Sequence, residues 1–364
     1  MDISRAGVEP AVVKFYRQYM QQISDVTYPP GNLLVKQDVQ DSLYKYFFDG
    51  SQNKFLPPPR YQARILKRII EEIEKSCRDP DQDQVSDRLM EHMGYLATIP
   101  RQPDSDEAQQ MLVHSYFPPL PLDEPGVRPV LIKEARNLLS RGTNVGLRTW
   151  EAALHLGWYL TVQRPDLVRD KTVFELGAGT GFLSLLCAGQ LGAAHVVATD
   201  GLAHVCDILQ ANVDLNRDNY NGSGSGSGTG PGTGPDPGTS SLFRAPEVRL
   251  LDWTDRPELD RVIAEAKASG VRYDLAIGAD ITYHPDILRP LAELLGVLKD
   301  HFPGMAILIS ATIRSDTFAQ FTSICRNEVG FKVVELPCNI PDGLRCSGLF
   351  HSVATEIKIV SLER

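Results

Sequence analysis

The sequence has little of what membrane proteins, secreted proteins and nucleic-acid-binding proteins need. No uninterrupted apolar run in its 364 residues reaches the roughly 18 residues of a membrane span. Residues 1–10 carry acidic side chains and lack the apolar core of a signal peptide. Lys and Arg number 37 against 46 Asp and Glu, and the formal net charge of -9 argues against a broad basic surface for nucleic acid. We therefore expect no membrane contact and no direct nucleic-acid partner.

Metal-site and hydrolase signatures are also missing. The six cysteines include no C-x-x-C pair and no histidine at zinc spacing, and the eight histidines form no ligand cluster, so no metal is predicted. Reduced thiols are typical of a cytoplasmic protein, which is the location we expect. Ser310 and His284 do not indicate a hydrolase, because the G-x-S-x-G turn is absent.

The chain has the composition of a globular protein large enough for two domains, with 42% hydrophobic and 23% charged residues. Apolar residues recur at helical spacing in 11–20, 39–48 and 61–73. The residues up to about 121 therefore predict a helical N-terminal domain, 1–121, to which we assign substrate docking. The second domain would span 122–364. We expect a monomer, although nothing in the sequence sets the oligomeric state.

From residue 172 onward, short apolar runs alternate with helical patterns. This alternation predicts an α/β fold with a doubly wound, mostly parallel, seven-stranded sheet and helices on both faces. Ligands of such folds bind beyond the carboxyl ends of the strands, at the point where the strand order reverses. The expected strands are 172–175, 196–199, 248–251, 273–279, 305–310, 332–335 and 352–359, and the expected helices are 182–191, 203–216, 257–268, 287–298 and 317–329.

A Gly/Ser/Pro-rich segment at 221–241 interrupts this pattern. It has almost no apolar residue and cannot bury a core of its own. It falls between a predicted helix and the next strand, where a flexible insertion costs little. The Gly-Ser repeats are typical of an engineered linker, whereas the Pro/Thr-rich second half favours a natural low-complexity insertion.

The glycine-rich turn after the first of these strands is the strongest motif. Residues 172–181 read T-V-F-E-L-G-A-G-T-G, so Glu175 ends an apolar run and Gly177, Gly179 and Gly181 follow. A strand, a Gly-rich turn and a helix hold nucleotide-like cofactors, although a plain tight turn is the alternative. A carboxylate before the turn gains nothing from an anionic phosphate. It suits a cofactor with an ammonium and a sulfonium, such as S-adenosylmethionine.

Acidic residues end the next two strands. Asp200 lies about 20 residues beyond the turn, where a carboxylate accepts ribose hydroxyls in dinucleotide enzymes and methyltransferases alike. A helix N-cap is its alternative role. Asp252 can accept from an adenine amino group while the Trp253 indole covers the purine. A core tryptophan with a capping aspartate explains this pair equally.

The fourth strand ends in D-I-T-Y, from Asp280 to Tyr283, beside the glycine turn in a doubly wound sheet. Asp280 can pair with a cationic amine and Tyr283 can line a channel, whereas a polar strand end that caps the helix after Pro285 is the alternative. Trp150 precedes the first strand of this sheet. Spacing favours its packing on the sheet edge, and the other interpretation is an aromatic wall for the cofactor.

Together these motifs resemble the class I, seven-stranded S-adenosylmethionine-dependent methyltransferases. D-x-x-Y at the fourth strand and G-L-x-T-W-x-A-A-L upstream are similar to their lysine-directed group. H-S-Y-F-P, L-Q-A-N-V-D-L-N, L-D-W-T and A-D-I-T-Y-H-P resemble the eukaryotic elongation factor 2 lysine methyltransferases in their fungal form, from residue 111 to the end. The helical N-terminal part fits in position and length with weaker motifs, and the 221–241 insertion departs from the family.

The resemblance implies the roles of single residues and the reaction. The cofactor would contact Trp150, Gly177, Ala178, Gly179, Asp200, Trp253 and, through its backbone, Ala279. Asp280 and Tyr283 would border a lysine channel. The implied reaction is transfer of methyl groups from S-adenosylmethionine to a lysine of elongation factor 2, and the family fold ends in an antiparallel strand pair. The target lysine and the degree of methylation are not implied.

The expected chemistry is in-line displacement of the methyl group by a neutral lysine amine, in which the enzyme orients and desolvates. Asp280 would stabilise an ammonium, so we assign it to docking the amine and leave the proton to water. One rival is a methyltransferase for another protein or a small molecule, which the cofactor motifs do not exclude. The other is a non-catalytic module that binds partners through its helical region.

Overall fold

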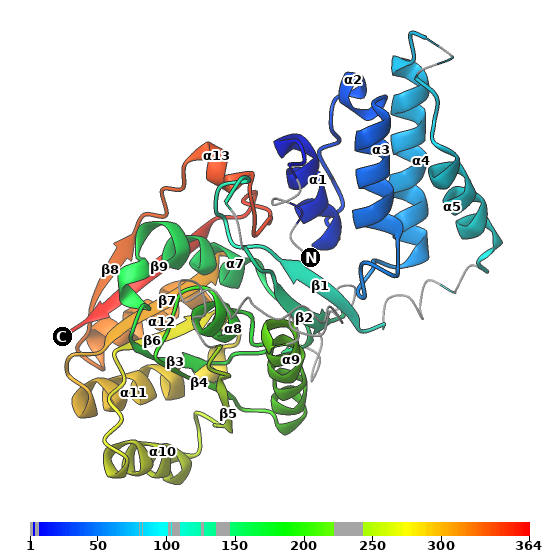
Figure 1. Cartoon of the computed structure of the whole chain (residues 1–364). Coiled ribbons are helices and arrows are strands. Elements are labelled where there is room, and N and C mark those ends of the chain that lie inside the picture. The colour runs from blue at the N-terminus through cyan, green and yellow to red at the C-terminus, as the bar shows by residue number, and fades with distance from the viewer. Residues whose placement is uncertain are drawn as a thin grey trace, which may run out of the picture. The chain divides into compact units, whose positions relative to one another are not determined.

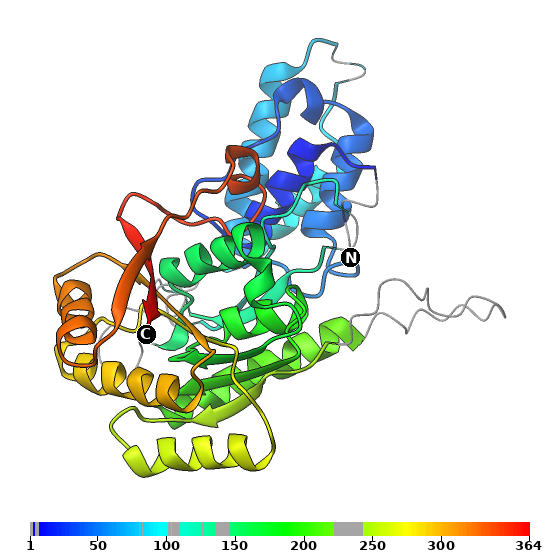
Figure 2. The same ribbon diagram turned by 90° about the vertical axis from the view of Figure 1, so that its left-hand side faces the viewer.

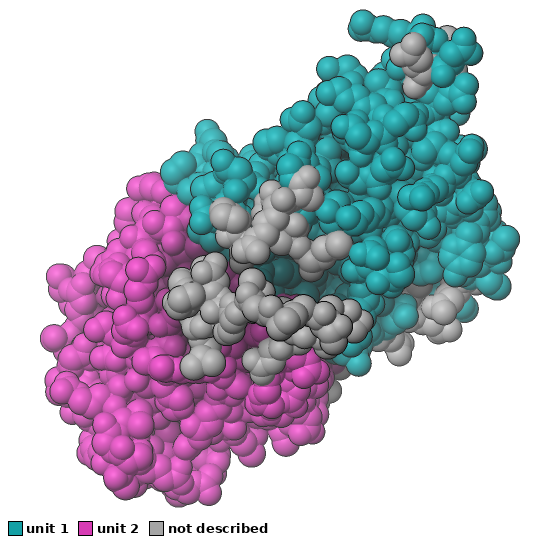
Figure 3. Space-filling model, in the orientation of Figure 1, with its two compact units in different colours: residues 1–138, 341–350 teal, residues 139–340, 351–364 magenta. Residues whose placement is uncertain are grey.

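The computed structural model describes residues 3, 7–79, 81, 83–100, 103, 110–124, 127–135, 146–221 and 243–364. The chain divides into two compact units, which Figure 3 colours separately. The first unit comprises Met1–Leu138 and Pro341–Phe350, and the second comprises Leu139–Ile340 and His351–Arg364. The predicted insertion at 221–241 lies outside the described residues, apart from Asn221 at the end of a helix. Within the described part, no helix is long and apolar enough to cross a membrane.

The first unit is mainly helical, as its apolar spacing predicts. Aromatic rings fill its core: the ring centroid of Phe47 lies 5.0 Å from that of Phe15 and 4.8 Å from that of Tyr19. The apolar faces of short amphipathic helices are buried together there, which stabilises helices that would be marginal alone. The helices are α1 (Pro10–Met20), α2 (Gly31–Leu34), α3 (Gln37–Leu43), a π-helical turn (Tyr44–Phe48), α4 (Pro59–Ser76) and α5 (Asp87–Thr98).

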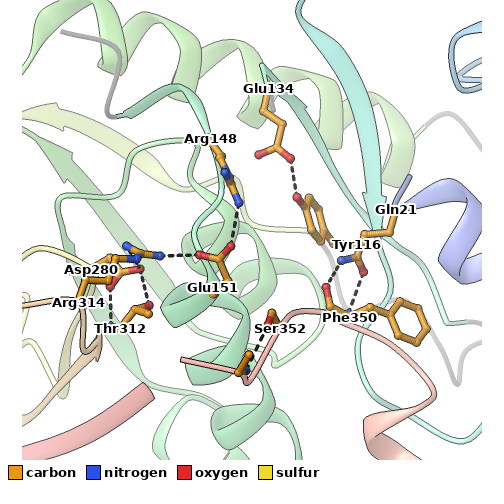
Figure 4. A network of polar contacts seen from close by, with 11 residues as sticks. Gln21, Tyr116, Glu134, Arg148, Glu151, Asp280, Thr312, Arg314, Phe350 and Ser352 are labelled. Atoms are coloured by element: carbon orange, nitrogen blue, oxygen red, sulfur yellow. Dashed lines mark hydrogen bonds and ion pairs between the residues drawn. The ribbon is translucent and has the colours of Figure 1, made fainter. Parts of the chain in front are cut away.

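A two-stranded sheet in this unit corrects the prediction of helix as far as residue 121. Strand β1 (Leu112–Tyr116) pairs antiparallel with β2 (Val130–Glu134). A short apolar run does not distinguish helix from strand, and pairing with a distant segment decides between them here. The Tyr116 hydroxyl donates a hydrogen bond to the buried carboxyl of Glu134 across this pair (Figure 4).

A segment more than 300 residues away completes the first unit. The guanidinium of Arg17, which is 2% exposed, donates to the Ser347 carbonyl at 2.8 Å. The amide group of Phe350 donates to the side-chain oxygen of Gln21 at 3.0 Å (Figure 4). The short helix α13 (Asp342–Arg345) lies in this segment. Buried polar groups of α1 and of Gln21, which follows it, thus have partners that no local sequence pattern signals.

The second unit contains the predicted seven-stranded sheet. Its strand order is β5-β4-β3-β6-β7-β9-β8. Strand β9 runs antiparallel to both of its neighbours, and the other four neighbouring pairs are parallel. The predicted last strand, 352–359, begins later, because residues 351–356 form no strand. The strands are β3 (Thr172–Leu176), β4 (His195–Asp200), β5 (Glu247–Leu250), β6 (Leu275–Ala279), β7 (Ala306–Thr312), β8 (Lys332–Leu336) and β9 (Ile357–Glu363).

Helices cover both faces of this sheet (Figures 1 and 2). The side chains of Phe174 and Leu176 enter the main core with α10, α11 and α12, whereas Glu175 between them reaches α8 on the other face. The period-2 alternation of a strand therefore separates its core residues from its acid. The helices are α7 (Glu151–Trp158), continued by a π-helical turn (Tyr159–Gln163) and a 3-10 turn (Pro165–Leu167), α8 (Phe182–Gly189), α9 (Ala203–Asn221), α10 (Arg256–Ala268), α11 (Pro285–His301) and α12 (Thr317–Asn327).

The reversal of strand order fixes where a ligand can bind. From β3 the chain moves outward to β4 and β5, then returns to the other side of β3 as β6. The chain therefore continues from the carboxyl end of β3 into a helix on one face of the sheet, and from that of β6 into a helix on the other face. A crevice opens between these two strand ends.

Candidate active site

A cavity of about 250 Å³ lies at the carboxyl ends of β3, β4, β5 and β6, wholly within the second unit. Arg148, Thr149 and Ala153, at and before the start of α7, contribute another wall. The structure brings together in this one cavity the following residues that the sequence predicts for a site: Trp150, Glu175, Gly177, Ala178, Gly179, Asp200, Asp252, Trp253, Ala279, Asp280 and Tyr283.

The glycine turn forms the floor of the cavity. Gly177 and Gly179 have φ values of +59° and +54°, which disfavour any residue with a Cβ. A Cβ on Gly177 would lie 2.7 Å from Cγ2 of Ile281, so this glycine also permits close packing against the loop after β6.

Gly181 is not among the residues that line the cavity. It precedes α8 with φ +82°, and a Cβ there would lie 2.1 Å from Cδ1 of the buried Leu209 on α9. Its hydrogen is therefore needed for helix packing behind the cavity wall.

Asp200 connects two backbone turns at the end of β4. Its Oδ2 accepts from the Gly179 amide at 3.0 Å, and its Oδ1 accepts from the Leu202 amide at 3.2 Å. Burial raises the pKa of this carboxyl, and the backbone hydrogen bonds act against that rise. Asp200 thus orders both the glycine turn and the start of the next loop.

Glu175 is buried beneath the turn and is 3% exposed. Its Oε2 accepts from the backbone amide of Ser184 at 2.8 Å and from the Ser184 hydroxyl. Burial raises the pKa of Glu175 to about 8 even though both hydrogen bonds favour its charged form. A cationic group that enters the cavity would favour the charged form of this carboxyl, which burial disfavours.

The Asp252–Trp253 pair is divided between two environments. Asp252 is exposed, and its Oδ1 accepts from the Thr254 amide at 2.8 Å and from the Thr254 hydroxyl at 2.7 Å, which closes a tight turn. The indole of Trp253 packs on the core, and its Nε1 is buried without a hydrogen-bond partner among the described residues. A buried donor of this kind in a cavity wall is suited to a ligand acceptor or a water molecule.

Asp280 occupies the end of β6 with φ +52°, which is uncommon for a residue other than glycine. Its Oδ1 accepts from the Thr312 amide at 2.7 Å and its Oδ2 from the Thr312 hydroxyl at 3.0 Å (Figure 4). The N-cap of α11 is His284, which accepts from the Asp286 amide, so Asp280 does not cap that helix. Tyr283, which is 56% exposed, lies in the same loop and lines the cavity.

Several neighbours of the site were not found from the sequence. Ser184 binds Glu175, Thr312 binds Asp280, and Arg314 lies 3.9 Å from Asp280. Arg148 and Glu151 are three residues apart at the start of a helix, a spacing that signals an ion pair. The other contacts join separate strands and helices, and no sequence spacing signals them.

The carboxyl groups of Glu175, Asp200, Asp252 and Asp280 give the cavity wall an acidic character that suits a cationic ligand. Among the described residues, no group of three or more His, Cys, Asp or Glu side chains could hold a metal ion. The cavity presents carboxyl, hydroxyl, indole and guanidinium groups as well as backbone groups, which can orient charged or polar ligands.

Comparison with known proteins gives a consistent result. Residues 136–224 match the family described as lysine methyltransferase. Protein-lysine N-methyltransferase EFM3 of Chaetomium thermophilum is 33% identical over 362 residues, 99% of this chain and 99% of that protein. Protein-lysine N-methyltransferase EEF2KMT of Mus musculus is 30% identical over 194 residues, 52% of this chain and 51% of that protein. The solved methyltransferase domain of bacterial CtHen1 covers 58% of this chain and 98% of its own, at 14% identity and a TM-score of 0.37. The chain therefore belongs to the S-adenosylmethionine-dependent protein-lysine N-methyltransferase family.

Proposed function

We propose that this protein-lysine methyltransferase acts on a lysine of translation elongation factor 2. The observation that carries the proposal is the position of Asp280 and Tyr283, whose D-I-T-Y motif lines the same cavity as the glycine turn. That motif, with G-L-R-T-W-E-A-A-L upstream, resembles the elongation factor 2 methyltransferases. The names EFM3 and EEF2KMT of two relatives agree with such a substrate.

The cavity residues fit S-adenosylmethionine. Asp200 keeps a half-buried carboxyl group at the end of β4 where ribose hydroxyls would bind, and the glycine at 177 lets Ile281 and Trp253 pack closely against the turn. Glu175 would meet the ammonium group, and the unpartnered Nε1 of Trp253 would gain an acceptor. The residues proposed to hold the cofactor are Trp150, Glu175, Gly177, Ala178, Gly179, Asp200, Asp252, Trp253 and Ala279, with Gly181 supporting the turn from behind.

When bound, S-adenosylmethionine would supply a methyl group on a sulfonium, whose sulfur would leave as a neutral thioether as a neutral amine bonds to the methyl carbon. The protein's part is to admit a lysine side chain, orient its nitrogen and exclude water. Asp280, fixed by Thr312, accepts a hydrogen bond from the amine, and Tyr283 borders the channel. Asp280 is not the proton acceptor, and the proton leaves to solvent.

The first unit would dock the protein substrate. Its helix α5 exposes two large apolar side chains, Met90 at 49% and Tyr95 at 60%, while Leu89 and Leu96 of the same helix are buried. Large apolar side chains left exposed on an otherwise packed helix are suited to contact with a protein partner. With a translation factor as substrate, the enzyme would act in the cytoplasm, as a monomer.

The test is to incubate the enzyme and the Asp280→Asn variant with S-adenosylmethionine labelled in its methyl group and a cell lysate, and to identify labelled proteins by mass spectrometry. Label on a lysine of elongation factor 2 with the wild-type chain, and none with the variant, supports the proposal. Label confined to a different protein or to a small molecule rejects elongation factor 2. No label, together with no cofactor binding in calorimetry, would indicate a binding module.

A further inference from the structure

Four charged side chains form a chain of contacts beside the cavity, at the start of α7 and the ends of β6 and β7 (Figure 4). Arg148 Nη2 lies 2.8 Å from Oε1 of Glu151, and Arg314 Nη2 lies 2.8 Å from Oε2 of the same carboxylate. Arg314 Nη1 lies 3.9 Å from Oδ2 of Asp280. Arg314 therefore stands between two carboxylates and is hydrogen-bonded to only one of them.

The aromatic ring of Trp150 helps to place both guanidinium groups. The central carbon of Arg148 lies 5.0 Å from the Trp150 ring centroid, and that of Arg314 lies 5.1 Å from it. Cation–π contact and the bond to Glu151 hold Arg314 in place although its side chain is 49% exposed. The guanidinium is thus a fixed charge at the edge of the site.

Asp280 retains acceptor capacity for a substrate. A carboxylate offers about four acceptor positions, and here Thr312 uses two and the Ala152 amide a third. Arg314 contributes charge without taking the remaining position, because its Nη1 lies 3.9 Å from Oδ2 of Asp280, beyond hydrogen-bond distance. An amine could therefore hydrogen-bond to Asp280 without displacing Arg314.

Methyl transfer imposes opposite demands on Asp280. The amine must be neutral to attack, yet an isolated carboxylate beside a lysine stabilises the ammonium form. An ammonium in contact with Asp280 would lie within about 7 Å of the Arg314 guanidinium, close enough for their repulsion to offset much of that stabilisation.

We propose that Arg314 is a positioning residue that lets Asp280 orient the substrate amine without holding it protonated. Thr312 on β7 and the α7 backbone at Ala152 face Asp280 as neutral donors, and Arg314 faces it as the cation. Glu151 and Arg148 lie behind Arg314 and compensate each other, and Tyr283 lies in the same loop as Asp280. The inference concerns the methyl transfer itself and does not depend on which protein carries the lysine.

The test is the pH dependence of the single-turnover rate of the Arg314→Gln variant, with saturating cofactor. Its substrate is elongation factor 2 or, if the lysate labels another protein, that protein. The rate rises with pH as the bound amine loses its proton. Without the cation, the pKa of the bound amine rises, so the rising limb moves to higher pH by about one unit. At a pH on that limb the rate falls about tenfold, and it recovers at higher pH.

Two further variants separate this role from a structural one. Arg314→Lys keeps a positive charge near Asp280, so its rising limb should lie closer to that of the wild type than that of Arg314→Gln does. The Arg148→Gln variant removes the other cation that contacts Glu151 and Trp150. Arg148 has no ion pair with Asp280, so this variant should leave the limb in place whatever its effect on the maximum rate.

Calorimetry with S-adenosylhomocysteine and the thermal midpoint check that each variant is folded. An unshifted limb in a folded, cofactor-binding Arg314→Gln variant would overturn the proposal. Failure of the wild type on elongation factor 2 would affect only the proposed substrate.

Discussion

Thr312 binds both carboxylate oxygens of Asp280, with its backbone amide 2.7 Å from Oδ1 and its hydroxyl 3.0 Å from Oδ2. The two residues end neighbouring parallel strands, β6 and β7. Asp280 also keeps a left-handed backbone conformation, which the surrounding structure must stabilise. The acceptor for a substrate amine is thus oriented before a substrate arrives, which avoids the cost of ordering it during the reaction.

The Asp280→Asn variant tests this orientation without changing the size of the side chain. The amide oxygen can still accept from Thr312, but the charge is lost and one acceptor oxygen becomes a donor. We expect the methyl-transfer rate to fall by about a hundredfold or more, because a misplaced nucleophile costs that much. The affinity for S-adenosylhomocysteine, measured by calorimetry, should change by less than about threefold. A near-normal rate would contradict the proposed role of Asp280.

The Glu175→Gln variant tests the buried carboxyl through stability. Folding raises the pKa of Glu175 from 4.5 to about 8, so the folded protein binds this proton more tightly than the unfolded chain does. The stabilisation that the bound proton contributes is fully present below pH 4.5 and is lost as pH rises toward 8. Over this window the wild type should lose up to about 1.4 kcal/mol of unfolding free energy per pH unit relative to the variant. Urea unfolding at pH 5, 6, 7 and 8 measures the difference. Parallel curves for the two proteins would show that Glu175 is ionised throughout.

Cofactor binding should release a proton from Glu175 near pH 7. The ammonium of S-adenosylmethionine favours the charged carboxylate and so lowers the pKa that burial raises to about 8. The calorimetric binding enthalpy should therefore vary with the ionisation enthalpy of the buffer, with a slope between zero and one proton. The slope should vanish in Glu175→Gln. An equal slope in both proteins would assign the proton to another group.

The Gly181→Ala variant separates packing from cofactor contact. The alanine would have to adopt φ +82°, and its Cβ would collide with the Leu209 side chain. We therefore expect the free energy of unfolding to fall by about 1–3 kcal/mol more than it does in Gly270→Ala. Gly270 is the matched control, because it has φ +71° with no atom within 4 Å of the added Cβ. Urea unfolding at one pH compares the two variants. Equal losses would mean that Leu209 moves aside at little cost.

Much of the second unit could be predicted from local sequence. Each of the first five predicted strands overlaps a strand of the sheet, because an apolar run between turn residues is itself the signal of a buried parallel strand. The cavity could be anticipated for the same reason. Glu175, Asp200 and Asp280 each fall at a strand end, and parallel strand ends meet at one edge of a sheet.

The first unit was harder to predict. Residues 112–116 form a strand where the sequence predicts helix, and their strand character depends on pairing with 130–134. The segment 341–350 belongs to this unit through contacts with Arg17 and Gln21, which lie more than 300 positions earlier. Contacts at such separation leave no periodicity in the sequence.

The succession of strands and helices in the second unit, the glycine turn and the acids at the strand ends can all be predicted from the sequence, since they depend on neighbouring residues and on the period of each element. The environment of each acid depends instead on contacts that form only in the folded chain. Burial against α8 raises the pKa of Glu175. Thr312, at the end of β7, holds the Asp280 carboxyl by hydrogen bonds, and Arg314 just after it places a positive charge nearby. The physical reason is that desolvation and charge interactions depend on distance in space, which the chain sets only when it folds.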